Sequence, residues 1–143
     1  MRHYSRGVTL IELMIAVAIV AILAAVGYPA YTSFVVESRR AEAKKELSTL
    51  AVLQEQYYAD NAEYSASLAD LGLAGAGASS YNTESAYYSV TLTASAAAGT
   101  FSAKATAIGS QLSSDTDCKS FSINEEGAKS AVSSTGTSST DCW

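Results

Sequence analysis

Glu12 is the residue of this chain that is most unusual for its surroundings. It opens an apolar run, since no charged residue occurs from Leu13 to Val36, a stretch of 24 residues. An unpaired carboxylate in hydrocarbon costs a few kcal/mol, so such a residue indicates a function when a partner can be named. Cleavage after Gly7 would create that partner, because it places a new α-amine on Val8, four residues before Glu12.

The chemistry that this pair predicts is recognition between copies of the chain. The amine of one copy could meet Glu12 of the next copy when their two helices are staggered. In a low-dielectric filament core, any other stagger leaves a buried charge unpaired, so the pairing would fix the register. The candidate assembly residues are therefore Val8 and Glu12, and Gly7 and Val8 flank the predicted cut.

Catalytic and metal-binding arrangements find little support. His3 is the single histidine and lies in the segment that the cut would remove. That argues against a Ser-His-Asp triad, a Cys-His pair and a histidine metal site. Asp115, Asp117 and the Glu125–Glu126 pair suggest calcium, but their spacing lacks the acidic and glycine pattern of an EF-hand loop. We interpret them as turn and solvated residues, and we expect no enzymatic activity, metal or cofactor.

The two cysteines, Cys118 and Cys142, both lie late in the chain. An even pair in a chain destined for export predicts one disulfide, whereas two free buried thiols would suit a cytosolic protein. The bond would close a loop of about 25 residues, worth roughly 3–4 kcal/mol in the chain-entropy model. It would hold the Ser/Thr-rich tail, residues 133–140, against the rest of the domain.

The apolar run has three interpretations. Its 24 residues reach about 36 Å as a helix, more than the roughly 30 Å of a bilayer core. A secretory signal peptide has a core of about 7–15 residues followed by its cleavage site, which this run exceeds. A plain transmembrane anchor fits the hydropathy but does not explain Glu12. A short basic leader with Arg2 and Arg6, cut after Gly7, accounts for both the apolar run and Glu12.

Helical patterning continues beyond the apolar run to about Ala59. Pro29 removes one backbone hydrogen bond and favours a kink, although a tolerated transmembrane proline is an equal alternative. Glu37 and Arg40 have the spacing of a surface pair, so we interpret the basic cluster around them as a solvated or subunit-facing surface. On another face, residues at helical spacing predict a stripe that packs on a globular head: Ala43, Leu47, Leu50, Gln54 and Tyr57.

The rest of the chain has the pattern of a small antiparallel sheet. Residues 72–86 are rich in Gly, Ala and Ser and predict a loop. Four short strands follow, at 88–94, 101–107, 121–123 and 128–132, with a turn at 124–127. Short connections favour a meander packed on the helix, which supplies the other layer of the core. The predicted fold is α+β. Its predicted parts are a leader (1–7), a transmembrane and filament-core helix (8–36), an amphipathic continuation (37–60) and a head (61–143).

The segment Gly7–Met14, GVTLIELM, resembles the type IV prepilin signature: a glycine before the cut, an apolar residue, then Thr-Leu-Ile-Glu. The basic leader and the later Tyr28–Pro29 also match this signature, and the chain resembles type IVa pilins of the Gram-negative PilE-like group. The stretch 56–61 resembles the helix end of pilins related to the Gram-negative minor pilin group. The resemblance implies the pilin fold, a long helix on a four-stranded antiparallel sheet. It also implies that a membrane-embedded prepilin peptidase cuts after Gly7 and methylates the amine of Val8, where most members have phenylalanine.

The function that the resemblance implies is a structural subunit of a type IV pilus, either major or minor. Its partners would be other pilin subunits, the prepilin peptidase and an inner-membrane assembly machinery. The precursor would cross the bacterial inner membrane once. The assembled extracellular fibre, or fimbrium, would support adhesion, twitching motility or DNA uptake.

Two other functions stay open. A type II secretion pseudopilin would have the same N-terminus, although the disulfide weighs against the major pseudopilin, which is expected to carry a calcium site. A DNA-receptor minor pilin would need a basic face. From Asn61 onward the chain has three lysines, no arginine and eight acidic residues, so we expect no direct nucleic-acid binding.

Overall fold

A computed structural model describes residues 8–143, so the predicted leader, including Gly7, lies outside the described residues. The chain divides into two compact units between Val35 and Val36, and each unit is described by itself below. The elements, in chain order, are α1 (Leu10–Asn61), β1 (Ser80–Asn82), β2 (Tyr88–Ser95), β3 (Thr100–Ala107), α2 (Gly109–Ser114), β4 (Ser120–Asn124) and β5 (Lys129–Val132).

In the N-terminal unit, α1 begins at a side-chain cap. The backbone N–H of Glu12 donates to Oγ1 of Thr9 at 3.3 Å, and the N–H of Leu13 donates to the Thr9 carbonyl at 3.2 Å. A threonine followed three residues later by a glutamate is the sequence pattern of a capping box. The cap therefore fixes where the helix starts and places Glu12 in its first turn.

Pro29 lies inside α1 and does not end it. Proline has no backbone N–H to donate, and its ring disfavours a regular helix around it. The hydroxyls of Thr32 and Ser33 donate to the Pro29 carbonyl at 2.9 and 3.1 Å, so this turn gains side-chain hydrogen bonds. The predicted kink at Pro29 stays a prediction.

The large apolar side chains of this unit have no protein cover. None of the most apolar 18-residue window of α1 is buried, and the helix is long and apolar enough to cross a membrane. Leu10 and Leu23, for example, are 77% and 66% exposed. This burial pattern differs from that of a core helix in a soluble domain, whose apolar face is covered.

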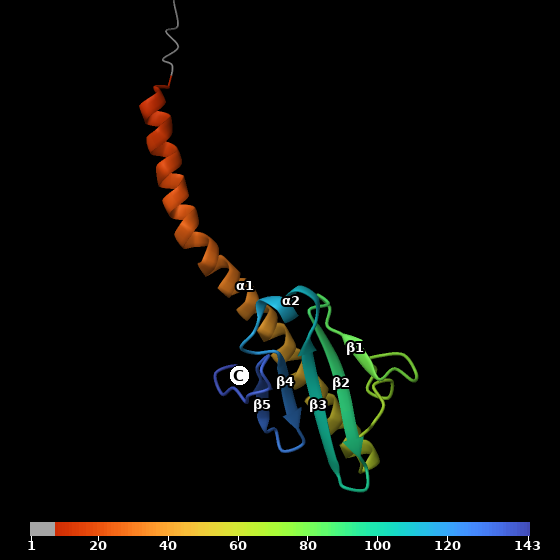
Figure 1. The fold of residues 1–143 in the computed structure, drawn as a ribbon. Helices are drawn as coiled ribbons and strands as arrows, with labels where there is room; N and C mark the ends of the chain where they lie inside the picture. The colour runs from red at the N-terminus through yellow and green to blue at the C-terminus, as the bar shows by residue number, and fades with distance from the viewer. Residues whose placement is uncertain (1–7) are drawn as a thin grey trace, which may run out of the picture. The chain divides into compact units, whose positions relative to one another are not determined.

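The head carries a five-stranded antiparallel sheet in the order β1-β2-β3-β4-β5 (Figure 1). The four strands predicted from alternation are confirmed as β2 to β5. The expected strand number is wrong by one, because β1 forms inside the stretch predicted as a loop. Tyr81 of β1 is opposite Val90 of β2, and its hydroxyl donates to Glu46 of α1 at 2.9 Å. This tertiary bond helps to hold a three-residue strand that has no alternating pattern of its own.

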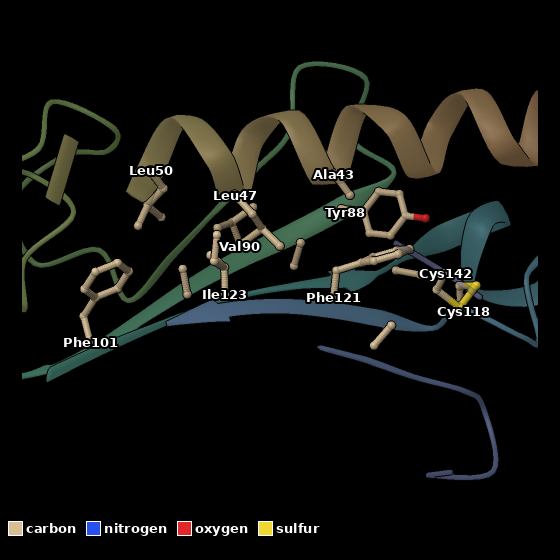
Figure 2. Close-up of a cluster of buried hydrophobic side chains, with 14 of the residues drawn as sticks. Ala43, Leu47, Leu50, Tyr88, Val90, Phe101, Cys118, Phe121, Ile123 and Cys142 are labelled. Atoms are coloured by element: carbon tan, nitrogen blue, oxygen red, sulfur yellow. A yellow bond between two sulfur atoms is a disulfide. The ribbon is translucent and has the colours of Figure 1, made fainter. Parts of the chain in front are cut away.

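One face of the sheet packs on the C-terminal part of α1, as Figure 2 shows. The stripe predicted on α1 supplies Ala43, Leu47, Leu50 and Gln54, all buried. The side chains that point from the strands toward α1 form the other half of the core: Tyr88, Val90, Phe101, Ala103, Ala105, Phe121 and Ile123. Each fully buried leucine or phenylalanine contributes about 1.5–3 kcal/mol, so these side chains form the main hydrophobic core of the head.

Gln54 is the buried polar member of the α1 stripe, and both ends of its amide are satisfied. Its Nε2 donates to the Ser65 carbonyl at 2.7 Å, and its Oε1 accepts the Ser65 N–H at 3.0 Å. A buried amide without partners would cost about 1–3 kcal/mol. The pair instead fixes the path of the chain just after α1 ends.

Candidate functional site

The structure places the described part of the predicted assembly site at the first turn of α1. Val8 is 72% exposed, and the Glu12 side chain is exposed as well. Within residues 8–143, the carboxylate of Glu12 makes no ion pair with another side chain. An acidic residue in the first turn also interacts favourably with the helix dipole, so Glu12 has a local structural role in addition to the predicted pairing role. Cleavage after Gly7 and methylation of Val8 stay predictions.

The head contains a buried ion pair between α1 and the segment after α2. Arg40 donates to both carboxylate oxygens of Asp115, from Nε to Oδ2 and from Nη2 to Oδ1, each at 2.7 Å. The Asp115 side chain is 0% exposed and that of Arg40 is 16% exposed. The backbone N–H of Cys118 also donates to Asp115 Oδ1 at 2.9 Å. This bidentate geometry is the strongest form of a charge-assisted hydrogen bond.

The electrostatics follow from this geometry. Burial alone would raise the pKa of Asp115, but the hydrogen bonds from Arg40 and Cys118 outweigh it and lower the pKa below its ordinary value. The hydrogen bond to Asp115 likewise raises the pKa of Arg40. Both groups are therefore charged at neutral pH, and each depends on the other to remain so inside the head.

Gln111 of α2 extends this pair into a network. Its Nε2 lies 3.1 Å from Asp115 Oδ2, 3.0 Å from the Tyr88 hydroxyl and 3.5 Å from the Val36 carbonyl, so one amide joins α2 to α1 and to the sheet. Burial raises the pKa of Tyr88 to about 12, so its hydroxyl stays protonated at neutral pH. The network fixes α2 at the end of the head where α1 enters it.

The interpretation of Asp115 as a solvated turn residue is wrong, and so is that of Arg40 as a purely surface residue. Arg40 does pair with Glu37 at 3.1 Å, as its spacing predicts, but its other nitrogens reach a carboxylate 75 residues away. Local spacing shows only the first of these partners. A tertiary ion pair has no short-range pattern, so the only sequence signal was one basic residue close to the predicted packing stripe.

Cys118 and Cys142, the pair that the sequence assigns to a disulfide, are bonded to each other. The bond holds the C-terminal tail along β5, which is an edge strand of the sheet. The Ser139 N–H donates to the Ala131 carbonyl at 2.9 Å, and the Trp143 indole N–H donates to the Ser130 carbonyl at 2.7 Å. Because unpaired edge strands are sites of unwanted strand pairing, the tail protects this edge.

A shallow apolar groove of about 600 Å³ lies between α1 and the turn joining β4 to β5. Ala51, Val52 and Phe101 contribute to its walls, and Glu55 and Glu125 lie among its lining residues. The carboxylates make this surface unfavourable for the phosphates of nucleic acid. Among residues 8–143, no group of three or more His, Cys, Asp or Glu side chains is arranged to hold a metal ion.

The protein has a long helix whose apolar N-terminal segment is uncovered. The helix continues into a head with an antiparallel sheet and a C-terminal disulfide. Together these features define a pilin-like protein. Residues 2–28 match the prokaryotic N-terminal methylation motif. Residues 29–122 match the family described as "Type IV minor pilin ComP, DNA uptake sequence receptor", which covers well over half of the chain. The chain belongs to this family of type IV pilins.

Individual relatives agree with that assignment. The chain is 41% identical over 70 residues to the type IV major pilin protein PilA of Myxococcus xanthus (strain DK1622), a match that covers 49% of this chain and 32% of PilA. It is 38% identical over 74 residues to the fimbrial protein EcpC of Eikenella corrodens, a match that covers 52% of this chain and 48% of EcpC. The matches thus cover between about a third and a half of the length of these curated relatives.

A solved structure supports the fold. A type IV pilin from Shewanella oneidensis matches with a TM-score of 0.52 and 27% identity, covering 76% of this chain and 97% of that chain. The match confirms the pilin fold expected from the sequence, a long helix packed on an antiparallel sheet.

Proposed function

We propose that this chain is a structural subunit of a type IV pilus. In this proposal it is made as an inner-membrane precursor, cut after Gly7 and polymerised through α1 into an extracellular fibre. The observation that carries the proposal is the bare apolar segment of α1, with one carboxylate in its first turn. No other feature of the described chain leaves so much apolar surface without cover.

The proposal follows from where that segment can be buried. A bilayer covers it in the precursor, and neighbouring helices cover it in a fibre. Moving a helix from lipid to protein gains little from the hydrophobic effect, because lipid tails are as apolar as leucine side chains. Packing and polar pairing must therefore select the correct arrangement. The pairing of the Val8 amine with Glu12 of a neighbouring copy is the polar contact that this sequence offers.

The test replaces Glu12 in a strain that lacks the native copy. Glu12→Gln keeps a polar side chain in the first turn but removes the charge, so it separates pairing from a general loss of polarity. Glu37→Gln is the matched control, because Glu37 is an exposed glutamate outside the apolar segment. We expect normal membrane insertion of all variants and at least about tenfold fewer fibres for Glu12→Gln, since a loss of about 1.4 kcal/mol per subunit already changes an association constant tenfold.

Normal fibre numbers with Glu12→Gln would show that the charge does not set the register. Loss of fibres with Glu37→Gln as well would point to a general defect in folding or export. The amount of each variant in the membrane fraction separates these cases from poor expression.

A second candidate function is that of a minor pilin that binds DNA, and the match of residues 29–122 to the DNA uptake sequence receptor family favours it. The charges of the head oppose it, because eight acidic residues face three lysines from Asn61 onward. Lys104 is exposed on the sheet face that points away from α1, and Lys129 lies near Trp143 at the edge of the sheet. Lys104 and Lys129 are the two lysines of the sheet that we would test first for a DNA contact.

Fluorescence anisotropy of labelled duplex DNA with the detergent-solubilised chain decides between the two candidates. A structural subunit predicts no binding beyond background at low salt. A receptor predicts an affinity that falls steeply as salt rises, because each phosphate contact releases counterions. In that case the double variant Lys104→Ala/Lys129→Ala would weaken binding and flatten the salt dependence.

A further inference from the structure

We propose that the heads of two copies bind each other end to end, with the groove of one head taking the Arg39 and Leu112 side chains of the next. The groove is the apolar one between α1 and the turn joining β4 to β5. Both surfaces lie within the compact unit Val36–Trp143. The inference rests on the proposed function as a fibre subunit, and it adds a contact between heads to the predicted pairing of Val8 with Glu12.

The groove combines an apolar surface with carboxylates that are held in place. Val52 of α1 lines it and is 56% exposed, one of three large apolar side chains of the head that are exposed. Glu55 accepts a hydrogen bond from the Tyr64 hydroxyl at 3.0 Å, and Glu125 accepts one from the Phe101 N–H at 3.2 Å. Among residues 8–143, neither carboxylate makes an ion pair. Such a surface suits a partner that carries a cation beside an apolar side chain.

The opposite end of the head carries a cation and an apolar side chain of this kind. The Arg39 guanidinium stacks on the Tyr87 ring, 3.8 Å from the ring centre, and donates to the Gln111 side chain at 3.4 Å. Unlike Arg40, it makes no ion pair within residues 8–143. Leu112 follows Gln111 in α2 and is 42% exposed. Because stacking already orders this guanidinium, binding a carboxylate costs it less conformational entropy.

The two surfaces are too far apart to meet within one head. Figure 1 shows α2 and the turn between β4 and β5 at opposite ends of the sheet. Glu55 lies 16 residues after Arg39 on α1, which is about 24 Å of helix. On β3, six residues separate Phe101 at the groove from Ala107 at the α2 end, about 20 Å of strand. No side chain spans this distance, so a head cannot fill its own groove.

A second copy of the chain is the occupant that matches the groove, because each copy carries both halves of the contact. The Arg39 guanidinium of one head would meet Glu55 and Glu125 of the next. Leu112 of the first head would then cover Val52 of the second. Two grooves cannot face each other, because their carboxylates would repel. The contact is therefore head to tail, the type that gives an open filament when its rotation does not close a ring.

The first test cross-links fibres made from the full chain. Val52→Cys and Leu112→Cys both replace exposed side chains, and the native cysteines are already bonded to each other. The chain with both changes is compared with Val52→Cys/Thr93→Cys, because Thr93 is exposed on the sheet face that points away from α1. Purified surface fibres are treated with a short bismaleimide, dissociated and separated by gel electrophoresis.

We expect a ladder of dimers, trimers and longer species from Val52→Cys/Leu112→Cys, because a head-to-tail contact gives each copy one partner at each end. The control and both single variants should remain monomers. Fibres that give only monomers or only dimers would overturn the inference and leave the fibre subunit intact. Absence of the unaltered chain from fibres would overturn the proposed function, and the inference with it.

A charge swap tests the same contact without cysteines. Arg39→Glu and Glu55→Arg should each give at least about tenfold fewer fibres, because each brings like charges together at a contact repeated in every subunit. The double variant Arg39→Glu/Glu55→Arg restores opposite charges and should recover most of the fibres. A role of Arg39 inside its own head could not be rescued by a residue about 24 Å away. Unchanged fibre numbers in the single variants, or no recovery in the double variant, would overturn the inference.

Discussion

The two halves of α1 belong to one continuous helix but have opposite relations to the rest of the chain. From Leu10 to Val35 the helix buries none of its most apolar window. From Val36 to Asn61 it buries a stripe against the sheet, with Leu47 and Leu50 both 0% exposed. This difference shows that the apolar character of a helix does not by itself make the helix part of a core. The second half finds its partner inside the chain, whereas the first half needs a partner outside it.

The charged residues of the two halves differ in the same way. Arg40 has its partner inside the head, because the carboxylate of Asp115 lies 2.7 Å away and is fully buried. Glu12 is exposed, and the structure pairs it with no cation among residues 8–143. A satisfied buried pair stabilises the fold of one subunit. A carboxylate in an apolar segment without such a partner is available to another subunit.

The largest expected effect comes from breaking the internal pair. Arg40→Ala leaves Asp115 buried without its cation, which costs about 3–5 kcal/mol of unfolding free energy. Lys45→Ala, an exposed neighbour on α1, is the control and should change stability by less than about 0.5 kcal/mol. Denaturant unfolding of the detergent-solubilised chain, followed by near-ultraviolet circular dichroism, measures both. Equal stability of the two variants would mean that the pair does not hold the head together.

A matched pair of leucine truncations compares the two halves directly. Leu47→Ala opens a cavity in the core and should lower head stability by about 2–5 kcal/mol. Leu23→Ala removes the same atoms from a side chain that is 66% exposed, so head stability should change by less than about 0.5 kcal/mol. The same unfolding assay applies. A large loss with Leu23→Ala would show that the N-terminal half is covered by the head, against this account.

Removing the disulfide tests whether the tail is a structural part of the head. The double variant Cys118→Ser/Cys142→Ser should lower stability by about 2–4 kcal/mol, because the bond closes a loop of about 25 residues in the unfolded chain. It should also release the tail from β5, seen as faster hydrogen exchange at the Ser139 amide. Unchanged exchange at Ser139 would mean that the edge of the sheet is protected without the bond.

Acid provides a smaller and reversible test of the same head network. The pKa of Asp115 is lowered in the folded head, whereas the unfolded side chain has a pKa of about 3.9. Its contribution is therefore complete above about pH 4–5 and is lost as the pH falls through the lowered folded value. Melting temperatures between pH 7 and pH 3 should show this loss. Arg40→Ala removes the largest of the causes that lower the folded pKa of Asp115, so the loss of stability in acid should become smaller.

The sequence was sufficient for the parts of the fold that follow local periodicity. Alternation predicted β2 to β5, and helical spacing predicted the stripe at Ala43, Leu47 and Leu50, because each pattern follows from the geometry of its own element. β1 and α2 lack such patterns: one has three residues and the other six, and tertiary contacts through Tyr81 and Gln111 hold them in place.

The candidate sites show the same difference between local sequence signals and tertiary contacts. Glu12 could be identified because its surroundings are wrong for a carboxylate, a property that is visible in the sequence itself. Asp115 could not, because it is followed by a polar segment and its partner Arg40 lies 75 residues earlier. Thr9 was also missed as the helix cap, although its spacing to Glu12 is the capping-box pattern and could have identified it.

The most direct test of the account examines the N-terminal half in its proposed final location. Surface fibres are purified from cells that express this chain, and their tryptic peptides are analysed by mass spectrometry. No lysine or arginine lies between Val8 and Arg39, so trypsin releases the whole first half as one peptide. We predict that this peptide begins at Val8 and is heavier by one methyl group. A fibre peptide that begins at Gly7, which trypsin would release after Arg6 from a chain that was not cut after Gly7, would contradict the account. So would fibres without this chain while it is abundant in the membrane.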